Sequence, residues 1–237
     1  MRLLVLAGGF GTRLKTTIPE VPKALAPTGE VPFLQLQLEH WLSQGLREFI
    51  FLLHHQADQI ISFLKAQQGM LPNDCQIDWI IEPTPLDTGG ALAHAVKALG
   101  IKDDFLMTNA DTWLGSGIVE MTQSAAPAMA VVLLADVSRY GQVHLDQSNH
   151  VTAFAEKNAK SGAGWINAGL CHLSAGMFKD WGGQPFSLER ELLVTLVQNH
   201  SLTAVPLQTD FIDIGVPAEY HRFCRWVEAG RQIPLCN

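Results

Sequence analysis

The chain has 237 residues, of which 47% are hydrophobic and 16% charged, and its formal net charge is −7 at pH 7. This composition can bury a sizeable core, which excludes disordered, collagen-like and coiled-coil classes. The acidic balance argues against a nucleic-acid or anionic-membrane surface. No stretch reaches the ~20 apolar residues of a membrane span. We therefore expect a cytoplasmic protein with no nucleic-acid or membrane partner.

The first half of the chain alternates short apolar runs with helical periodicity. Four apolar runs are typical of strands buried on both faces of a parallel sheet: residues 3–7, 49–53, 77–81 and 104–108. Apolar side chains recur at helical spacing between them, in residues 33–42, 60–64 and 91–99. This βαβαβαβ order predicts a doubly wound parallel sheet.

The pattern changes after Ser116. Four further strands with turns between them are expected at 130–135, 142–145, 151–154 and 166–173, as a mixed or antiparallel extension of the same sheet. Two more strands (203–207 and 211–214) and two helices (188–197 and 218–227) complete the chain. Because no repeat or linker interrupts it, we expect one continuous α/β domain over residues 1–237.

The loop after the first strand reads Gly8-Gly9-Phe10-Gly11-Thr12-Arg13-Leu14. Ligands of open α/β sheets bind at the carboxyl ends of strands, glycines let a backbone approach phosphate, and arginine adds a fork of donors. A dinucleotide fingerprint would need a third glycine where Leu14 stands, and a P-loop would need Gly-Lys-Ser/Thr. The local excess of basic residues in 1–25 also favours an anionic ligand over a merely tight turn.

Pro22-Lys23 follows, with prolines on either side that stiffen the loop around this lysine. Together with the glycine-rich loop it resembles the signature of the sugar-1-phosphate nucleotidyltransferases. Those enzymes join a nucleoside triphosphate to a sugar 1-phosphate and release pyrophosphate. The resemblance implies a Rossmann-like, doubly wound mixed sheet of the nucleotide-sugar (GT-A-like) transferase type. It also implies that Arg13, Lys23 and Asp111 are catalytic.

Later motifs resemble those of the same family in the same order: Glu82, then Pro85 to Ala91, Asn109 to Thr112 and Phe211 to Pro217. Asp87 stands where glycine is commoner in the family. Asp111 and Asp213 each end an apolar strand and are the expected ligands of Mg²⁺, which takes one or two carboxylates plus phosphate oxygens. The residues that the resemblance assigns to the nucleotide are Leu6, Ala7, Gly8, Gly9, Gly11, Thr12, Arg13, Glu82, Asp87, Thr88, Gly89 and Asn109.

The second half supplies the expected sugar-phosphate contacts. By resemblance these are Lys23, Tyr140, Gly141, Glu156, Lys157 and Asn167. The family pattern thus divides the domain into a nucleotide-binding half, residues 1–115, and a sugar-phosphate-binding half, residues 116–237. The sequence leaves the oligomeric state open, including a homo-oligomer.

Residues 186–193 and 211–220 are similar to segments of the D-glycero-D-manno-heptose 1-phosphate guanylyltransferases, which serve polysaccharide biosynthesis. An acidic side chain such as Glu82 favours guanine, because a carboxylate can accept both N1–H and N2–H₂. Mannose-1-phosphate guanylyltransferase and a uridylyltransferase acting on an amino-sugar 1-phosphate are the alternatives within the family. Outside it stand a non-catalytic nucleotide-sugar-binding protein and a Rossmann oxidoreductase.

Three other residue types are expected to carry no chemistry. The four cysteines form no CxxC pair, which favours free thiols in a reducing compartment. His54-His55 lacks the spacing of a zinc motif, so loop histidines are favoured. Trp41, Trp79 and Trp226 lie on apolar faces and are expected in the core.

Overall fold

The computed structural model describes residues 1–14, 17–156 and 162–231. The strands are β1 (Arg2–Leu6), β2 (Glu48–Leu53), β3 (Gln76–Ile81), β4 (Asp104–Asn109), β5 (Thr112–Leu114), β6 (Ala128–Leu134), β7 (Gln142–Leu145), β8 (Val151–Ala155), β9 (Gly164–Ser174), β10 (Thr203–Leu207) and β11 (Phe211–Asp213). The α-helices are α1 (Phe33–Ser43), α2 (Ala57–Gln68), α3 (Asp87–Leu99), α4 (Ile118–Gln123), α5 (Leu193–Gln198) and α6 (Pro217–Glu228). Three short helical turns are η1 (Lys23–Leu25), η2 (Ala175–Phe178) and η3 (Leu188–Leu192).

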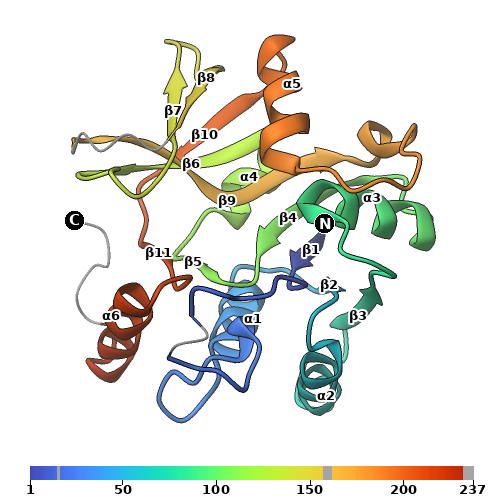
Figure 1. Cartoon of the computed structure of the whole chain (residues 1–237), viewed down its shortest axis with the longest axis vertical. Helices are drawn as coiled ribbons and strands as arrows, with labels where there is room; N and C mark the ends of the chain where they lie inside the picture. The colour runs from blue at the N-terminus through green and yellow to red at the C-terminus, as the bar shows by residue number, and fades with distance from the viewer. Residues whose placement is uncertain (15–16, 157–161, 232–237) are drawn as a thin grey trace.

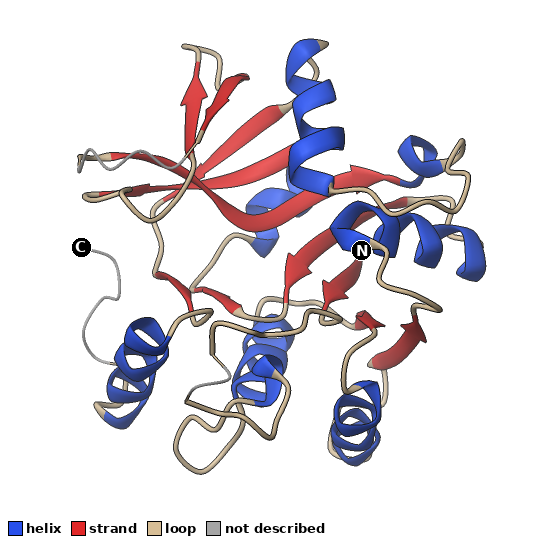
Figure 2. Cartoon of the chain, in the orientation of Figure 1, coloured by secondary structure: helices blue, strands red, loops and turns tan. Residues whose placement is uncertain are grey.

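The central sheet has the strand order β10-β6-β9-β4-β1-β2-β3 and carries the β7–β8 hairpin on β9. Its β1, β2, β3 and β4 strands run parallel, and β9 is antiparallel to both β4 and β6. The prediction of a doubly wound sheet with a mixed extension is therefore confirmed. The sheet lies as a layer between two sets of helices, with α1 and α2 on one side and α3 and α5 on the other (Figures 1 and 2).

The order of the parallel strands locates a switch point. The chain builds from β1 through β2 to β3 in one direction, and α3 then crosses to the other face and returns it to β4, on the far side of β1. The carboxyl ends of β1 and β4 flank the crevice that this reversal opens, which is where open α/β sheets bind ligands. The fold thus brings residues after Leu6 and after Asn109 together.

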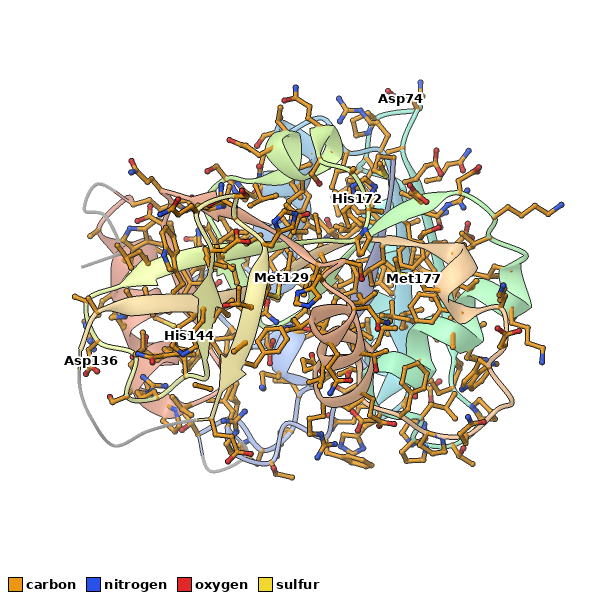
Figure 3. The ribbon with its side chains drawn as sticks, turned by 90° about the horizontal axis from the view of Figure 1, so that it is seen from above. Asp74, Met129, Asp136, His144, His172 and Met177 are labelled. Atoms are coloured by element: carbon orange, nitrogen blue, oxygen red, sulfur yellow. The ribbon has the colours of Figure 1, made fainter. Side chains whose placement is uncertain are left out.

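Two hydrophobic clusters cover the two faces of the sheet. One joins α1 and α2 to β1, β2 and β6, and the other packs α3 against β4 and β9. Figure 3 shows Met129 and His172 in the interior of this view, whereas Asp136 lies at its edge. A third cluster, between α1, α6 and the β5–β11 pair, buries Trp226 beside Trp113. Trp41 is buried as predicted, but Trp79 is only half-buried.

Some elements differ from the sequence predictions. The strand β5, the helix α4 and the helical turns η1 and η2 were not predicted, because each is six residues or shorter and shows no period. The helix predicted over 188–197 is divided into the turn η3 and the helix α5. The last strand, β11, pairs with β5 in a separate two-stranded sheet. Helix α3 begins at Asp87, earlier than the apolar periodicity indicated, because glycines and polar residues fill its first turn.

Cys75, Cys171 and Cys224 are free thiols, and Cys236 lies outside the described residues. Within the described ranges, every helix falls short of the length or apolarity that a bilayer crossing needs.

Candidate active site

A pocket of about 620 Å³ opens at the carboxyl ends of β1 and β4. It gathers most of the residues predicted for the nucleotide, the cations and the metal: Leu6, Ala7, Gly8, Gly9, Gly11, Arg13, Lys23, Glu82, Asp87, Thr88, Asn109, Asp111 and Asp213. Thr12 and Gly89 lie outside its lining. The switch point of the sheet is therefore also where the predicted chemistry converges.

The glycine-rich loop begins as a continuation of β1. The Ala7 N–H still donates to the Leu52 carbonyl at 3.0 Å, and the His55 N–H donates to the Gly8 carbonyl at 3.3 Å. Gly11 then adopts φ +60°, a left-handed conformation that a Cβ would disfavour. The loop thereby presents side-chain-free backbone to the pocket, with the exposed Arg13 at its end.

A lysine and two aspartates from distant parts of the chain meet in the pocket. Lys23 Nζ lies 2.6 Å from Asp111 Oδ2. The pairing of β11 with β5 sets Asp213 opposite Thr112, beside Asp111. Burial raises the pKa of Asp213, and the negative charge of Asp111 raises it further. Two facing carboxylates and one ammonium are thus held together at low solvent exposure.

Gly215 makes this arrangement possible. Its N–H donates to Asp213 Oδ1 at 2.7 Å. A Cβ at this position would lie 2.6 Å from the same oxygen and 3.1 Å from Lys23 Nζ. A larger residue would therefore displace the aspartate, the lysine or both.

The donor set suits a divalent cation that keeps part of its hydration. Within residues 1–14, 17–156 and 162–231, no three His, Cys, Asp or Glu side chains converge as a metal centre. Asp111 and Asp213 would therefore supply two carboxylates, and phosphate and water oxygens would complete the shell, as Mg²⁺ prefers.

His54 lines the same pocket, and the Phe10 ring contacts both His54 and His55.

Glu82 ties two loops together at the other side of the pocket. Only 7% of this residue is exposed, and burial raises the pKa of its carboxyl. Its Oε2 accepts the Leu86 N–H at 2.9 Å, and Oε1 would lie 2.8 Å from a Cβ on Gly8. The side chain therefore braces the glycine-rich loop against the start of α3.

Asp87 occupies a backbone conformation that favours glycine. Its φ is +60°, which accounts for the glycine that is commoner there in the family pattern. Aspartate tolerates this region better than most side chains. Its Oδ1 accepts the Thr88 N–H at 2.7 Å, and Oδ2 pairs with Arg190 Nη2 at 2.9 Å.

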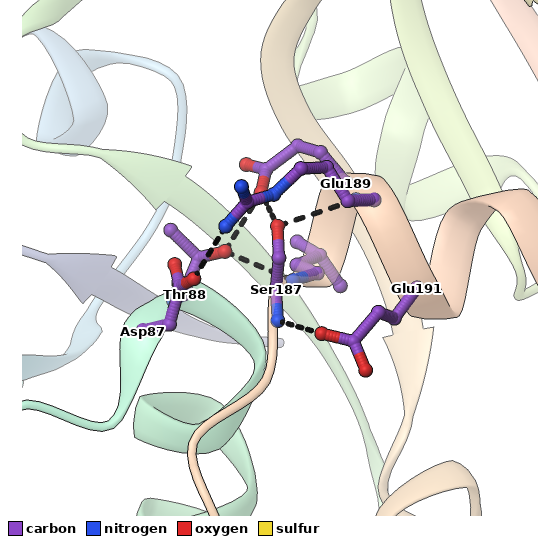
Figure 4. Close-up of polar contacts among 7 residues, drawn as sticks. Asp87, Thr88, Ser187, Glu189 and Glu191 are labelled. Carbon is purple, nitrogen blue, oxygen red and sulfur yellow. Dashed lines mark hydrogen bonds and ion pairs between the residues drawn. The ribbon is translucent and has the colours of Figure 1, made fainter.

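Residues 185–192, which we call the strap, close one side of the pocket and were not predicted as site residues. Pro185 and Glu189 line the pocket. The Phe186 carbonyl accepts the N–H groups of Gly89 and Gly90 at 3.0 and 3.1 Å. Figure 4 shows the strap's side chains meeting those of Asp87 and Thr88. The sequence flagged this segment by resemblance alone, since no spacing rule relates residue 189 to residue 88.

Lys23 lines this pocket, but the other described residues predicted for the sugar phosphate, Tyr140, Gly141, Glu156 and Asn167, lie outside its lining. Tyr140 stacks edge-on against Phe211, and burial raises its pKa to about 12. Asn167 Oδ1 accepts the Gly169 N–H at 2.9 Å, in an irregular stretch of β9. Gly141 and Glu156 are exposed, and Lys157 lies outside the described residues. Asn167 is linked to the pocket through Gly169, because a Cβ on Gly169 would lie 2.9 Å from Asn109 Nδ2, and Asn109 lines the pocket.

Comparison with known proteins assigns the chain to one family. The sequence profile of the family described as "Nucleotidyl transferase" matches residues 2–223. The chain belongs to this family. This chain is 32% identical over 225 residues to the D-glycero-α-D-manno-heptose 1-phosphate guanylyltransferase of Campylobacter jejuni. The alignment covers 94% of this chain and 98% of that enzyme. The predicted class, a nucleotidyl-transferring enzyme, is therefore confirmed.

One longer relative and two solved structures are also similar to this chain. A probable mannose-1-phosphate guanylyltransferase 1 from rice (Oryza sativa) is 30% identical over 228 residues, which are 93% of this chain but 63% of that enzyme. The crystal structure of HddC from Yersinia pseudotuberculosis complexed with GMP-PN superposes with a TM-score of 0.81 at 32% identity, covering 95% of this chain and 99% of that one. The structure of a protein described as a putative glucose-1-phosphate thymidylyltransferase from Bacillus anthracis shares the fold, with a TM-score of 0.78 at 18% identity over 100% of this chain and 98% of that one.

Proposed function

We propose that this nucleotidyltransferase is a guanylyltransferase that transfers GMP from GTP to D-glycero-D-manno-heptose 1-phosphate. The products are the GDP-heptose and pyrophosphate. The observation that carries this proposal is the 32% identity to a heptose 1-phosphate guanylyltransferase over nearly the whole of both chains. The mannose-1-phosphate guanylyltransferases stand second, because this chain spans 63% of the rice enzyme's length.

The reaction needs little covalent work from the protein. An oxygen of the sugar phosphate attacks the α-phosphorus, a new P–O bond forms, and the α–β phosphoanhydride bond breaks as pyrophosphate leaves in line. Position and charge stabilisation therefore decide the rate. Arg13 and Lys23, at the phosphate side of the pocket, are the side chains that neutralise the charge on the phosphates.

Mg²⁺ is the proposed cofactor, held by Asp111 and Asp213, and when bound it would neutralise phosphate charge. The protein's own contribution at this point is to hold two carboxylates together. The Gly215 N–H orients Asp213, and Lys23 orients Asp111. Burial and the negative charge of Asp111 raise the pKa of Asp213, and a bound divalent cation would offset the repulsion between the two carboxylates.

The division into a nucleotide-binding half, residues 1–115, and a sugar-phosphate-binding half, residues 116–237, is part of the proposal. Lys23, Tyr140, Gly141, Glu156, Lys157 and Asn167 are proposed to hold the sugar phosphate. After Lys23, which lines the pocket, Asn167 has the best support, because it accepts the N–H of Gly169, the residue that lies against Asn109. A role in polysaccharide biosynthesis and a cytoplasmic location remain predictions from the sequence.

The test is a matrix of nucleoside triphosphates against sugar 1-phosphates, read by pyrophosphate release. The matrix contains GTP, ATP, UTP and dTTP against heptose, mannose, glucose and N-acetylglucosamine 1-phosphates. The highest kcat/KM is expected for GTP with the heptose. Equal kcat/KM for UTP and GTP would refute the assignment of guanine as the base. Faster turnover of mannose 1-phosphate than of the heptose 1-phosphate would refute the assignment of the sugar.

A further inference from the structure

The pocket has a second region, away from the lysine and aspartates, that suits a flat base. Leu86 and Ala91 line it and are each only 3% exposed, and Pro185 of the strap adds apolar surface. Three carboxylates also line the pocket, on Glu82, Asp87 and Glu189. Which of them is available to a base depends on the hydrogen bonds that each already accepts.

Glu82 and Asp87 are committed to the protein. Glu82 accepts the Leu86 N–H through Oε2, and its Oε1 lies against Gly8. Asp87 accepts the Thr88 N–H through one oxygen and pairs with Arg190 through the other. Asp87 therefore has both oxygens engaged. Glu82 has one oxygen engaged, and its other oxygen lies against the Gly8 backbone in a side chain that belongs to a residue only 7% exposed.

Glu189 is oriented through one oxygen only. Its Oε2 accepts the Thr88 hydroxyl at 2.7 Å and the Ser187 hydroxyl at 3.2 Å (Figure 4). Each hydroxyl in turn accepts a backbone N–H, from Leu188 at 2.9 Å and from Arg190 at 3.2 Å respectively. The two hydroxyl protons are thereby aimed at Oε2. Within the described residues, no hydrogen bond to Oε1 is found.

The helical turn η3 explains why this glutamate faces the pocket. Ser187 caps the turn by accepting the Arg190 N–H, and Glu191 reaches back to the Ser187 N–H at 2.8 Å. In an ordinary capping box, the acidic residue that accepts the N-cap N–H stands three residues after the N-cap. Here the wider π-turn places that residue, Glu191, four residues after Ser187. Because Glu191 accepts the Ser187 N–H, Glu189 is not needed for that hydrogen bond. It lies on the turn that packs against α3.

We propose that Glu189 reads the guanine base, accepting the N1–H and N2–H₂ donors of GTP through its unshared oxygen. Adenine presents an acceptor at N1, and inosine lacks the amino group at C2. Either base would leave the oriented carboxylate short of donors, which costs affinity because an oriented polar group loses its partners. The inference rests on the proposed function, since a guanine-reading carboxylate presupposes GTP as substrate.

The test compares kcat/KM for GTP, ITP and ATP in the wild type and Glu189→Gln, with the sugar 1-phosphate that the matrix identifies. The glutamine oxygen can keep the Thr88 and Ser187 hydroxyls, so its NH₂ turns toward the base donors. We expect the GTP-to-ATP ratio to fall by about 10- to 100-fold. The GTP-to-ITP ratio should fall to about 1, because the amino group loses its acceptor. Calorimetric titration with GTP and ITP should give the same loss of discrimination without turnover.

Glu191→Gln is the matched control, because it removes a neighbouring charge while its amide oxygen can still accept the Ser187 N–H. It should keep the wild-type ratios. Glu189→Asp, which shortens the reach and keeps the charge, covers the case in which the glutamine variant fails to fold, and it too should lose discrimination. Folded Glu189 variants with wild-type base ratios would overturn the inference. A wild type that discriminates poorly between GTP and UTP would instead refute the proposed function.

Discussion

Lys23 and Asp111 form a short ion pair in the pocket. Their charged atoms lie 2.6 Å apart, and the two side chains are 15% and 29% exposed. Under the proposed function, a triphosphate would compete for the ammonium and a divalent cation for the carboxylate, so substrate binding would exchange this contact for others. The ion pair would hold both side chains in position for these ligands.

The two aspartates are expected to be required for turnover. Asp111→Asn and Asp213→Asn should each lower kcat by about 10²-fold or more, since metal neutralisation of phosphate charge contributes several kcal/mol. Chelation of Mg²⁺ should abolish activity in the wild type. Pyrophosphate release measures the rate, circular dichroism verifies folding, and the exposed Asp180→Asn is the control. A near-normal rate in a folded variant would remove that aspartate from the metal site.

Arg13 contributes a geometry as well as a charge. Arg13→Ala and Lys23→Ala should each cost about 2–4 kcal/mol in kcat/KM, the scale of one preorganised electrostatic contact. Arg13→Lys should recover little, because a point charge lacks the bidentate fork. The measurement is the steady-state kcat/KM for GTP in each variant. Lys179→Ala, at an exposed position, is the control. Wild-type kcat/KM in Arg13→Lys would exclude the fork contact.

Glu82 should make stability fall as the pH rises. Burial raises the pKa of its carboxyl in the folded chain, so the unfolded chain loses its proton first as pH increases. The free energy of unfolding therefore decreases as the pH rises from the ordinary glutamate pKa to the raised pKa of the folded chain. Glu82→Gln, which can still accept the Leu86 N–H, should lack this loss. Melting temperatures measured from acidic to neutral pH should fall less for Glu82→Gln than for the wild type. Glu30→Gln, at an exposed position, is the control. Parallel curves for the wild type and Glu82→Gln would contradict the assignment of this pH dependence to Glu82.

At the scale of elements, the strap and the start of α3 form one unit. The Phe186 carbonyl accepts two N–H groups from the first turn of α3, and the Phe186 N–H donates to the Leu86 carbonyl at 3.1 Å. The ring of Phe186 fills the space beside Gly89, where a side chain would stand. The first turn of a helix leaves N–H groups without intrahelical partners, and here another chain segment satisfies them.

Gly89→Ala should loosen this unit. The new Cβ would lie 2.2 Å from the Phe186 ring, so the ring or the strap must move. Overpacking of this kind costs about 1–3 kcal/mol, and displacement of the strap should raise the KM for GTP. Thermal melts and GTP kinetics test both effects. Phe186→Ala in the same chain should relieve the clash, and a double variant no more stable than Gly89→Ala would argue against steric conflict.

At the scale of the whole molecule, one sheet unites the two proposed halves. β4 of the first half is flanked by β1 and by β9 of the second half. The apolar clusters on both faces of the sheet also draw residues from both halves. Asp213 and Glu189, from the second half, line the pocket beside the glycine-rich loop. The pocket is therefore assembled across the proposed division.

Residues 1–115 should not fold alone. Without β9, the edge of β4 and fully buried side chains such as Phe105 and Leu106 would be exposed. We expect the fragment to aggregate or remain unfolded, as judged by size-exclusion chromatography and circular dichroism beside the full chain. A monomeric fragment with a cooperative melt would show that the first half is an independent unit.

The sequence by itself determined the parallel half of the sheet and the signature residues. Both follow from local properties: continuous apolar runs that only a doubly covered strand can bury, and glycine, arginine and lysine at short spacing. The boundaries of β7 and β10 were also predicted to the residue, since alternating or apolar runs ended by turn residues define them.

Only the tertiary structure decided how distant segments meet. The contact of Asp213 with Lys23 and Asp111 depends on pairing between β11 and β5, two strands of three residues each that show no periodicity of their own. Glu189 reaches Thr88 because a π-turn and the Phe186 carbonyl dock the strap on α3. These interactions join residues a hundred or more positions apart, and the hydrogen bonds and packing that create them exist only once the sheet has formed.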